Sequence, residues 1–298
     1  MIAVLLVTAT LQSSPAPAMS APAPAAPATA SAHGTIRRYE IDAPELHDSN
    51  RAVRVYTPPG YNDPAAAARR YPVVYVLHGW PGSEGNWPGM GHATETADSM
   101  IASGRIPSVL LVFPNGSGKG FLGRSLWIDS YDGSSKVETF LTHRLVSWVD
   151  STFRTIRSPQ DRAVVGLSDG GTAAINLVLQ HPDVFGAAGS HSADLRVRRT
   201  YSLGGVAGPD PGGTKLLQEH SPLEYAAEAL KKVDSPVIYF DCGADDESVA
   251  ENREFDALLT KLGVAHTYHE FPGTHEWKYW RSHLPASLAA VTARMHDE

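Results

Sequence analysis

The chain has 298 residues, of which 42% are hydrophobic and 8% aromatic, a composition that suits one large domain with a buried core. Its formal net charge of −7 is spread along the sequence without any basic stripe, so the electrostatic footprint of a nucleic-acid-binding protein is absent. The single cysteine, Cys242, has no partner for an internal disulfide. It ends an apolar run, which predicts a buried thiol rather than a reactive one.

The first 34 residues differ in composition from the rest. An apolar stretch at 2–11, too short to span a bilayer, precedes a Pro/Ala/Ser-rich run that contains the small residues Ala16-Pro17-Ala18. This pattern predicts a signal peptide and an unstructured spacer, followed by one domain at 35–298 of a secreted or periplasmic protein. No Lys or Arg precedes the apolar stretch, as one normally does in a signal peptide, so a cytoplasmic protein with an unstructured tail is the alternative.

From residue 35 onward, strand and helix patterns alternate. Period-two runs at 36–41 and 52–57 predict an antiparallel opening pair. Continuous apolar or β-branched runs predict buried strands at 71–77, 109–113, 163–165 and 237–240, and a further short strand is expected at 266–271. Helical patterns cover 93–103, 136–153, 171–180, 249–262 and 277–294. The alternation predicts an α/β fold with a mostly parallel sheet and helices on both faces.

One segment interrupts this alternation. Residues 196–221 are rich in glycine and proline and have no clear period. A loop of this length in a compact domain is usually functional or mobile, so we expect it to cover a cleft.

The sequence around Ser168 predicts a nucleophile. Gly166-Leu167-Ser168-Asp169-Gly170 matches G-x-S-x-G and lies between the buried run at 163–165 and a helical pattern. In such a strand–turn–helix the serine occupies a sharp turn and its hydroxyl projects above the sheet. The alternative is a plain glycine-rich turn.

A serine nucleophile needs a base and an acid, which here would follow it in the order acid, then histidine. Asp245 and Asp246 come directly after the strand at 237–240, and the residues alone do not decide between them. His275 is the expected base because it lies after the acid on a Pro/Gly loop. His191, just past another expected strand, comes too early in the chain to be the base and is expected to line the cleft. No histidine or acidic cluster has metal-ligand spacing, so we expect neither a metal nor a cofactor.

Two backbone N–H groups are expected to stabilise an oxyanion, those of Trp80 and Asp169. The Asp169 side chain then starts close to the reacting centre. It either turns to a partner, such as an arginine or the helix N-terminus, or repels anionic substrates. Trp87, Trp127 and Tyr131 are expected to line the substrate cleft, with ordinary core packing as the alternative.

Five motifs together resemble a known group. They are His78-Gly79-Trp80-Pro81-Gly82, Phe113-Pro114-Asn115-Gly116, Gly166-Leu167-Ser168-Asp169-Gly170-Gly171, Cys242-Gly243-Ala244-Asp245-Asp246 and Pro272-Gly273-Thr274-His275-Glu276-Trp277. The chain resembles the esterase family that includes S-formylglutathione hydrolase, feruloyl and acetyl xylan esterases and the antigen 85 mycolyltransferases. The resemblance covers about residues 50–285. One departure is Asp169, where such sequences often have methionine.

The resemblance implies the α/β-hydrolase fold, Asp246 as the acid, and a serine esterase that hydrolyses carboxylic esters through an acyl-enzyme intermediate. The alternatives are an acyltransferase of the same fold and a non-catalytic binding protein. The expected partner is a small-molecule or polysaccharide-linked ester, with no nucleic acid and no membrane span.

Overall fold

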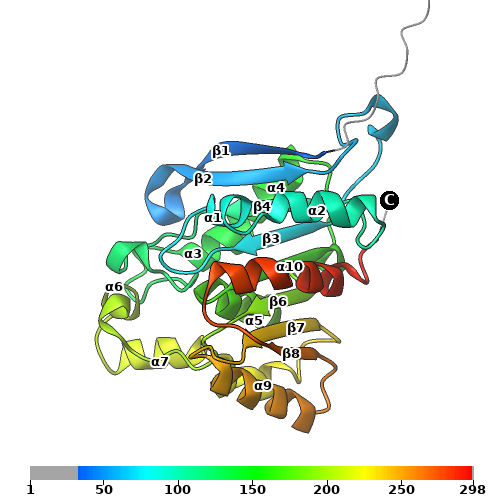
Figure 1. The fold of residues 1–298 in the computed structure, drawn as a ribbon. Coiled ribbons are helices and arrows are strands. Elements are labelled where there is room, and N and C mark those ends of the chain that lie inside the picture. The colour runs from blue at the N-terminus through cyan, green and yellow to red at the C-terminus, as the bar shows by residue number, and fades with distance from the viewer. Residues whose placement is uncertain (1–32, 297–298) are drawn as a thin grey trace, which may run out of the picture.

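The computed structural model describes residues 33–296, and within them eight strands form one sheet (Figure 1). The strand order is β1-β2-β4-β3-β5-β6-β7-β8. The pairs β1–β2 and β2–β4 are antiparallel, and every later pair is parallel. The expected α/β architecture with an antiparallel opening pair is therefore confirmed. The predicted signal peptide and spacer lie almost wholly outside the described residues.

The strand bounds follow the runs expected from the sequence, and β6 is the strand expected, without bounds, just before His191. They are β1 Thr35–Ala43, β2 Asp48–Thr57, β3 Val73–Leu77, β4 Leu110–Pro114, β5 Arg162–Leu167, β6 Ala187–His191, β7 Val237–Gly243 and β8 Thr267–Phe271. The sequence AAGSH of β6 has small residues where other strands have branched ones. Small residues are needed there because a Cβ on Gly189 would lie 3.1 Å from Val165 and 3.2 Å from Ser287.

Helices cover both faces of the sheet. They are α1 Asn86–Gly89, α2 Ala93–Ala102, α3 Val137–Thr139, α4 Val146–Thr152, α5 Asp169–Gln180, α6 Gly204–Ala207, α7 Gly212–Glu219, α8 Pro222–Ala229, α9 Val249–Lys261 and α10 Trp277–Thr292. A π-helical turn, Phe140–Leu145, joins α3 to α4.

Alternating side chains of the central strands define two hydrophobic cores. In β3, Val74 and Val76 pack in the core that contains residues of α2 and α10, in front of the sheet in Figure 1. Val73, Tyr75 and Leu77 point the other way, into the core formed with α4, α5 and α9. Because β3 is buried on both faces, its sequence is continuously apolar rather than alternating.

Residues 196–221 are not a structureless loop, contrary to the expectation. They form a short 3₁₀ turn, Tyr201–Leu203, followed by α6 and α7. Their apolar residues make a third, small hydrophobic cluster with the segment before α3: Leu126, Ile128, Leu203, Val206, Ala207 and Leu217. The helices are too short to give a periodic pattern, which explains why the sequence did not predict them.

The carboxyl end of this segment is held by a partly buried carboxylate, that of Glu138. Glu138 accepts hydrogen bonds from His181 Nε2 at 2.7 Å and from His220 Nε2 at 3.1 Å. Burial raises the pKa of Glu138, but the two imidazoles outweigh it and lower that pKa to about 2. Burial lowers the pKa of His220, and the Glu138 contact outweighs it, so the pKa of His220 lies above its ordinary value.

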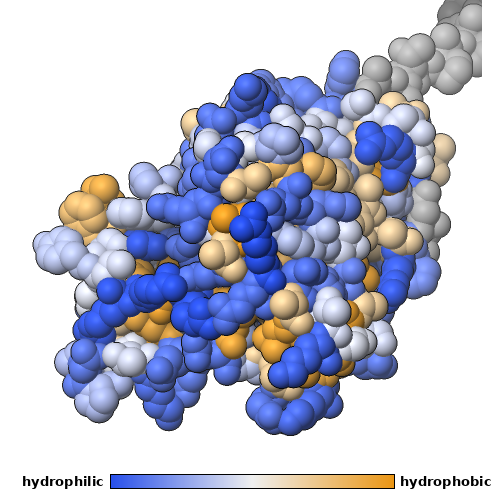
Figure 2. All heavy atoms as spheres, turned by 60° about the horizontal axis from the view of Figure 1, so that its bottom comes forward, coloured by the Kyte–Doolittle hydropathy of each residue, from blue (hydrophilic) through white to orange (hydrophobic). Residues whose placement is uncertain are grey.

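Cys242 lies in β7 and is fully buried, as the sequence predicts. Burial raises the pKa of its thiol far above the ordinary value. Elsewhere, the face shown in Figure 2 is mostly hydrophilic, and its exposed hydrophobic atoms form small separate patches. No helix among residues 33–296 combines the length and apolar character that crossing a bilayer requires.

Candidate active site

Ser168 occupies the turn between β5 and α5. Its φ of 52° and ψ of −125° are unusual for a residue with a side chain, and α5 begins at the next residue. The turn is tight because strand and helix backbones nearly touch. A Cβ on Gly166 would collide with the carbonyl oxygen of Gly170, and one on Gly170 would lie 2.6 Å from the His78 oxygen. The G-x-S-x-G spacing therefore forces the serine side chain out of the strand–helix layer, towards the carboxyl end of the sheet.

His275 and Asp246 reach Ser168 from the loops that follow β8 and β7. The Ser168 hydroxyl lies 3.0 Å from His275 Nε2. On the other side of the ring, His275 Nδ1 lies 3.0 Å and 3.2 Å from the two carboxylate oxygens of Asp246. The structure thus brings together the three residues that the sequence singled out, although 107 residues separate the serine from the histidine.

The geometry distinguishes the two neighbouring aspartates. Asp246 is buried and also accepts the Ser248 N–H at 2.9 Å, which fixes its orientation. Asp245 is exposed, and its backbone N–H donates a hydrogen bond to the Gly273 oxygen in the loop that carries His275. Burial raises the pKa of Asp246, but the hydrogen bonds from His275 and Ser248 outweigh it, and the net shift is downward.

Burial also acts on the base. It lowers the pKa of His275, but the hydrogen bond and the charge of Asp246 outweigh it, so the pKa of His275 lies above its ordinary value. A raised pKa means a stronger base. The arrangement can therefore accept the proton of the Ser168 hydroxyl while the carboxylate stabilises the resulting imidazolium.

The loop after β3 brings a second N–H donor beside the serine. A Cβ added to Gly79 would lie 3.0 Å from the Cβ of Ser168, so the Gly79–Trp80 peptide passes directly by the serine side chain. Within residues 33–296, neither the Trp80 N–H nor the Asp169 N–H donates to another protein group. Both are therefore free to donate to an oxyanion, and Asp169 adds the positive end of the α5 helix dipole.

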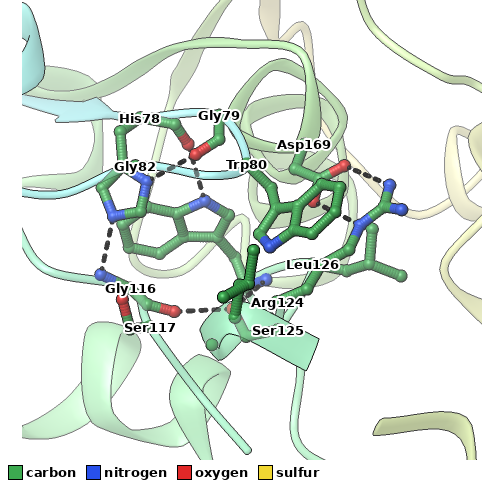
Figure 3. A pocket seen from close by; sticks show the side chains of 13 residues that line it. His78, Gly79, Trp80, Gly82, Gly116, Ser117, Arg124, Ser125, Leu126 and Asp169 are labelled. Atoms are coloured by element: carbon green, nitrogen blue, oxygen red, sulfur yellow. Dashed lines mark hydrogen bonds and ion pairs between the residues drawn. The ribbon is translucent and has the colours of Figure 1, made fainter. Parts of the chain in front are cut away.

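His78 holds this loop in place. Its Nδ1 lies 2.7 Å from the Gly79 oxygen, and the Gly116 N–H donates to its Nε2 at 3.0 Å (Figure 3). Nε2 accepts, so the proton must be on Nδ1 and the ring is neutral. Burial lowers the pKa of His78 to about 4, which keeps the ring neutral at physiological pH. His78 is thus a structural link between two loops.

The Asp169 side chain turns to an arginine that the sequence did not identify. Arg124 donates from Nε and Nη2 to the two carboxylate oxygens, at 2.9 Å and 2.8 Å (Figure 3). Burial raises the pKa of Asp169, whose side chain is nearly inaccessible, and the Arg124 guanidinium opposes that rise. Among the three expected roles, the arginine partner is the one observed.

Two of the aromatic residues expected in the cleft belong to the interior. Trp87 is 1% exposed, donates its indole N–H to the Leu77 oxygen at 2.8 Å and packs edge-on against Trp277. Its predicted substrate role is wrong, because its ring fills the core beneath the loop. Trp127 is 3% exposed and donates to the His78 oxygen at 3.0 Å, so it supports the loop from behind.

Other aromatic side chains are exposed. Tyr131 is 50% exposed and packs against Gly208 and Gly212 of the 196–221 segment. A row of rings leads outward from the loop after β3. Trp80 lies 6.2 Å from Phe121, which in turn lies 5.9 Å from Tyr201, with 90% of Tyr201 exposed. The sequence did not indicate Phe121 or Tyr201, since exposure depends on how distant loops meet.

His191 does not line the cleft. It is completely buried, with Nδ1 2.9 Å from Asp241 and Nε2 2.9 Å from the Ser287 hydroxyl. Its backbone oxygen accepts the Ser168 N–H, so it supports the serine turn from below. No group of three or more metal-ligating side chains occurs within residues 33–296.

Comparisons with known proteins find similarity to esterases. A family model described as "Putative esterase" matches residues 45–291. An esterase of Mycobacterium tuberculosis is 26% identical over 283 residues, covering 82% of this chain and 59% of that protein. A protein of Xylanibacter ruminicola named endo-1,4-beta-xylanase/feruloyl esterase is 32% identical over 250 residues, covering 84% of this chain and 30% of that protein.

This chain therefore spans between about a third and three fifths of the length of these relatives. A solved structure of a ferulic acid esterase superposes with a TM-score of 0.78 at 27% identity, covering 89% of this chain and 99% of that one. The likeness confirms the expected α/β-hydrolase fold.

Proposed function

The chain belongs to the esterase family, as its motifs predict, and we propose that it is a serine esterase in which Ser168 is the nucleophile. The observation that carries this proposal is the continuous hydrogen-bonded line from Ser168 through His275 to Asp246, with each contact between 3.0 and 3.2 Å. A serine hydroxyl is a weak nucleophile, and a base held by a third group is what activates it.

The proposed reaction has two halves. Ser168 Oγ attacks the ester carbonyl and passes its proton to His275, while the N–H groups of Trp80 and Asp169 stabilise the oxyanion. His275 then protonates the leaving alcohol, and an acyl-enzyme remains. In the second half His275 deprotonates water, whose oxygen attacks the acyl carbonyl. His275 then returns the proton to Ser168 Oγ as the acyl–Oγ bond breaks, which releases the carboxylic acid and free Ser168.

The test is the Ser168→Ala variant, assayed on p-nitrophenyl acetate. We expect a folded protein whose kcat falls by about 10³-fold or more, and a fluorophosphonate probe that labels Ser168 and no other serine. Addition of EDTA should leave wild-type activity unchanged, since no step uses a metal. Full activity in the alanine variant, or labelling of a different serine, would refute the assignment.

We further propose an aromatic or polysaccharide-linked ester as the substrate. The row of accessible rings at Trp80, Phe121 and Tyr201 offers faces on which a planar or sugar group can stack. Two similar proteins carry feruloyl or ferulic acid esterase in their names. Export, expected from residues 1–34, would bring the enzyme to such substrates.

A substrate panel tests this proposal independently of the nucleophile. It comprises p-nitrophenyl esters of increasing chain length, methyl ferulate and acetylated xylan. Preference for methyl ferulate or acetylated xylan in kcat/KM supports the proposal. Preference for long aliphatic acyl chains would overturn it and leave the serine mechanism intact.

A further inference from the structure

Arg124 contacts both residues whose N–H groups face the oxyanion position. Its Nε and Nη2 hold the two oxygens of the Asp169 carboxylate. Its guanidinium carbon lies 4.9 Å from the centre of the Trp80 ring, a cation–π distance. Figure 3 shows the guanidinium meeting the carboxylate beside the Trp80 indole, at one side of the same hollow. None of the proposed proton transfers uses Arg124.

We infer that Arg124 is a positioning residue of this site: by holding the Asp169 carboxylate and the Trp80 ring, it sets the direction of both oxyanion-hole N–H groups and neutralises the charge beside them. The inference rests on the proposed function. Arg124 touches neither the substrate carbonyl nor the serine, and it acts through the two residues it holds.

Geometry explains why an arginine is needed. A bidentate contact fixes the carboxylate plane as well as its position, because both oxygens bind at fixed spacing. Asp169 is the first residue of α5, so fixing its side chain limits rotation of its own peptide N–H. A lysine would place a point charge on the carboxylate and leave its plane free.

Charge gives the second reason. The Asp169 side chain is 4% exposed, and the backbone N–H of the same residue faces the position of the negative oxygen. An unpaired carboxylate a few ångströms from that oxygen would repel it, with little water to screen the repulsion. Arg124 removes this conflict. Its effect should therefore be larger in the transition state than in the bound substrate, so kcat should respond more than KM.

The third nitrogen of Arg124 extends the contact to the segment at 196–221. Nη1 donates to the Ser202 hydroxyl at 2.7 Å, in the turn next to the exposed Tyr201. The same guanidinium thus links the oxyanion hole to the segment that borders the aromatic row. Through this hydrogen bond, a substrate that contacts Tyr201 would change the position of Arg124 and so the direction of the oxyanion-hole N–H groups.

The experiment compares four purified variants with the wild type on p-nitrophenyl acetate, after active-site titration with a fluorophosphonate. For Arg124→Met, we expect kcat to fall by about 10- to 100-fold, while KM changes by less than about threefold. This loss is smaller than the loss caused by removing an oxyanion-hole donor, because both N–H groups remain. Arg124→Lys should lose less, but measurably. The double variant Arg124→Met/Asp169→Met replaces the pair by apolar groups and should recover kcat to within about threefold of wild type.

The fourth variant is the matched control. Arg253 makes the same Nε and Nη2 contacts to Glu270, at 2.7 Å and 2.6 Å, but as an exposed ion pair without a side-chain hydrogen bond to Ser168, His275 or Asp246. Arg253→Met should leave kcat and KM unchanged.

Each outcome has a definite meaning. An Arg124→Met variant with wild-type kcat, or a double variant as impaired as the single one, would overturn the inference. Should Arg124→Met fail to fold, Arg124→Lys and the double variant decide instead: wild-type kcat in the lysine variant would reject positioning by the bidentate contact. If the wild type itself hydrolyses no ester, it is the proposed function that fails.

Discussion

Replacing Asp246 by asparagine should remove most of the activity, and the structure explains how. Asp246 Oδ1 accepts the Ser248 N–H at 2.9 Å, and an asparagine keeps this bond by placing its amide oxygen there. Its NH₂ group then faces His275 Nδ1, which must accept instead of donate. The proton moves to Nε2, which lies 3.0 Å from the Ser168 hydroxyl and can no longer take its proton.

The size of the effect follows from this tautomer change. In a serine protease the equivalent substitution lowers kcat by about 10⁴-fold without disturbing the geometry. A similar loss here would correspond to about 5 kcal/mol of transition-state stabilisation. Asp245→Asn is the control, since its side chain is exposed and a surface change should alter activity by no more than about twofold.

A pH profile adds a second signature. Activity requires neutral His275, so kcat/KM should rise with pH through a pKa above the ordinary histidine value of 6.5. In Asp246→Asn the lowering effect of burial is no longer opposed by the carboxylate, and the inflection should move to lower pH. A larger loss in Asp245→Asn than in Asp246→Asn would refute the reasoning and shift the acid by one position.

Two further predictions concern the segment at 196–221. Because the pKa of His220 is raised in the folded state, its protonation adds to the free energy of unfolding. This contribution is fully present below pH 6.5 and is lost as pH rises through the folded-state pKa, so the melting temperature should fall over that range. His220→Gln should abolish this pH-dependent part, which a pH series of thermal melts measures; an unchanged slope would exclude the Glu138 contact as its source. Replacing residues 204–213 by a short Gly/Ser linker exposes part of the small cluster, at a cost of about 1–3 kcal/mol. It should change acyl chain-length preference more than stability, and loss of cooperative unfolding would show that the segment is scaffold.

The strands were predictable where burial on both faces leaves a continuous apolar run, as in β3 and β4. For β6 only a strand just before His191 was expected, without bounds, because AAGSH carries no strand preference and is required by the close packing around it. The meeting of Ser168, Asp246 and His275 was predictable, because each residue follows the carboxyl end of a strand, β5, β7 and β8 respectively. Parallel strands end at one edge of a sheet, so motifs placed after them meet there.

The rest of the site depends on contacts that leave no local pattern. Arg124 lies 45 residues before Asp169 and shares no motif with it, so only the fold reveals the pair. Trp87 was misplaced for a similar reason. From the sequence, a tryptophan after the oxyanion loop could line a cleft or pack in the core. Trp87 packs in the core because its ring contacts Trp277, a residue 190 positions later in the chain.

The buried thiol of Cys242 makes the protein convenient for site-directed labelling. It is the single cysteine of the sequence, and no solvent reaches it in the folded state. Thiolate is the reactive form, so a raised pKa and full burial together make the native protein inert to maleimides and methanethiosulfonates. A cysteine introduced in place of the exposed Tyr201 would then carry a fluorophore or spin label alone, without removal of the native residue. Such a label would report whether residues 196–221 change position while an ester is turned over.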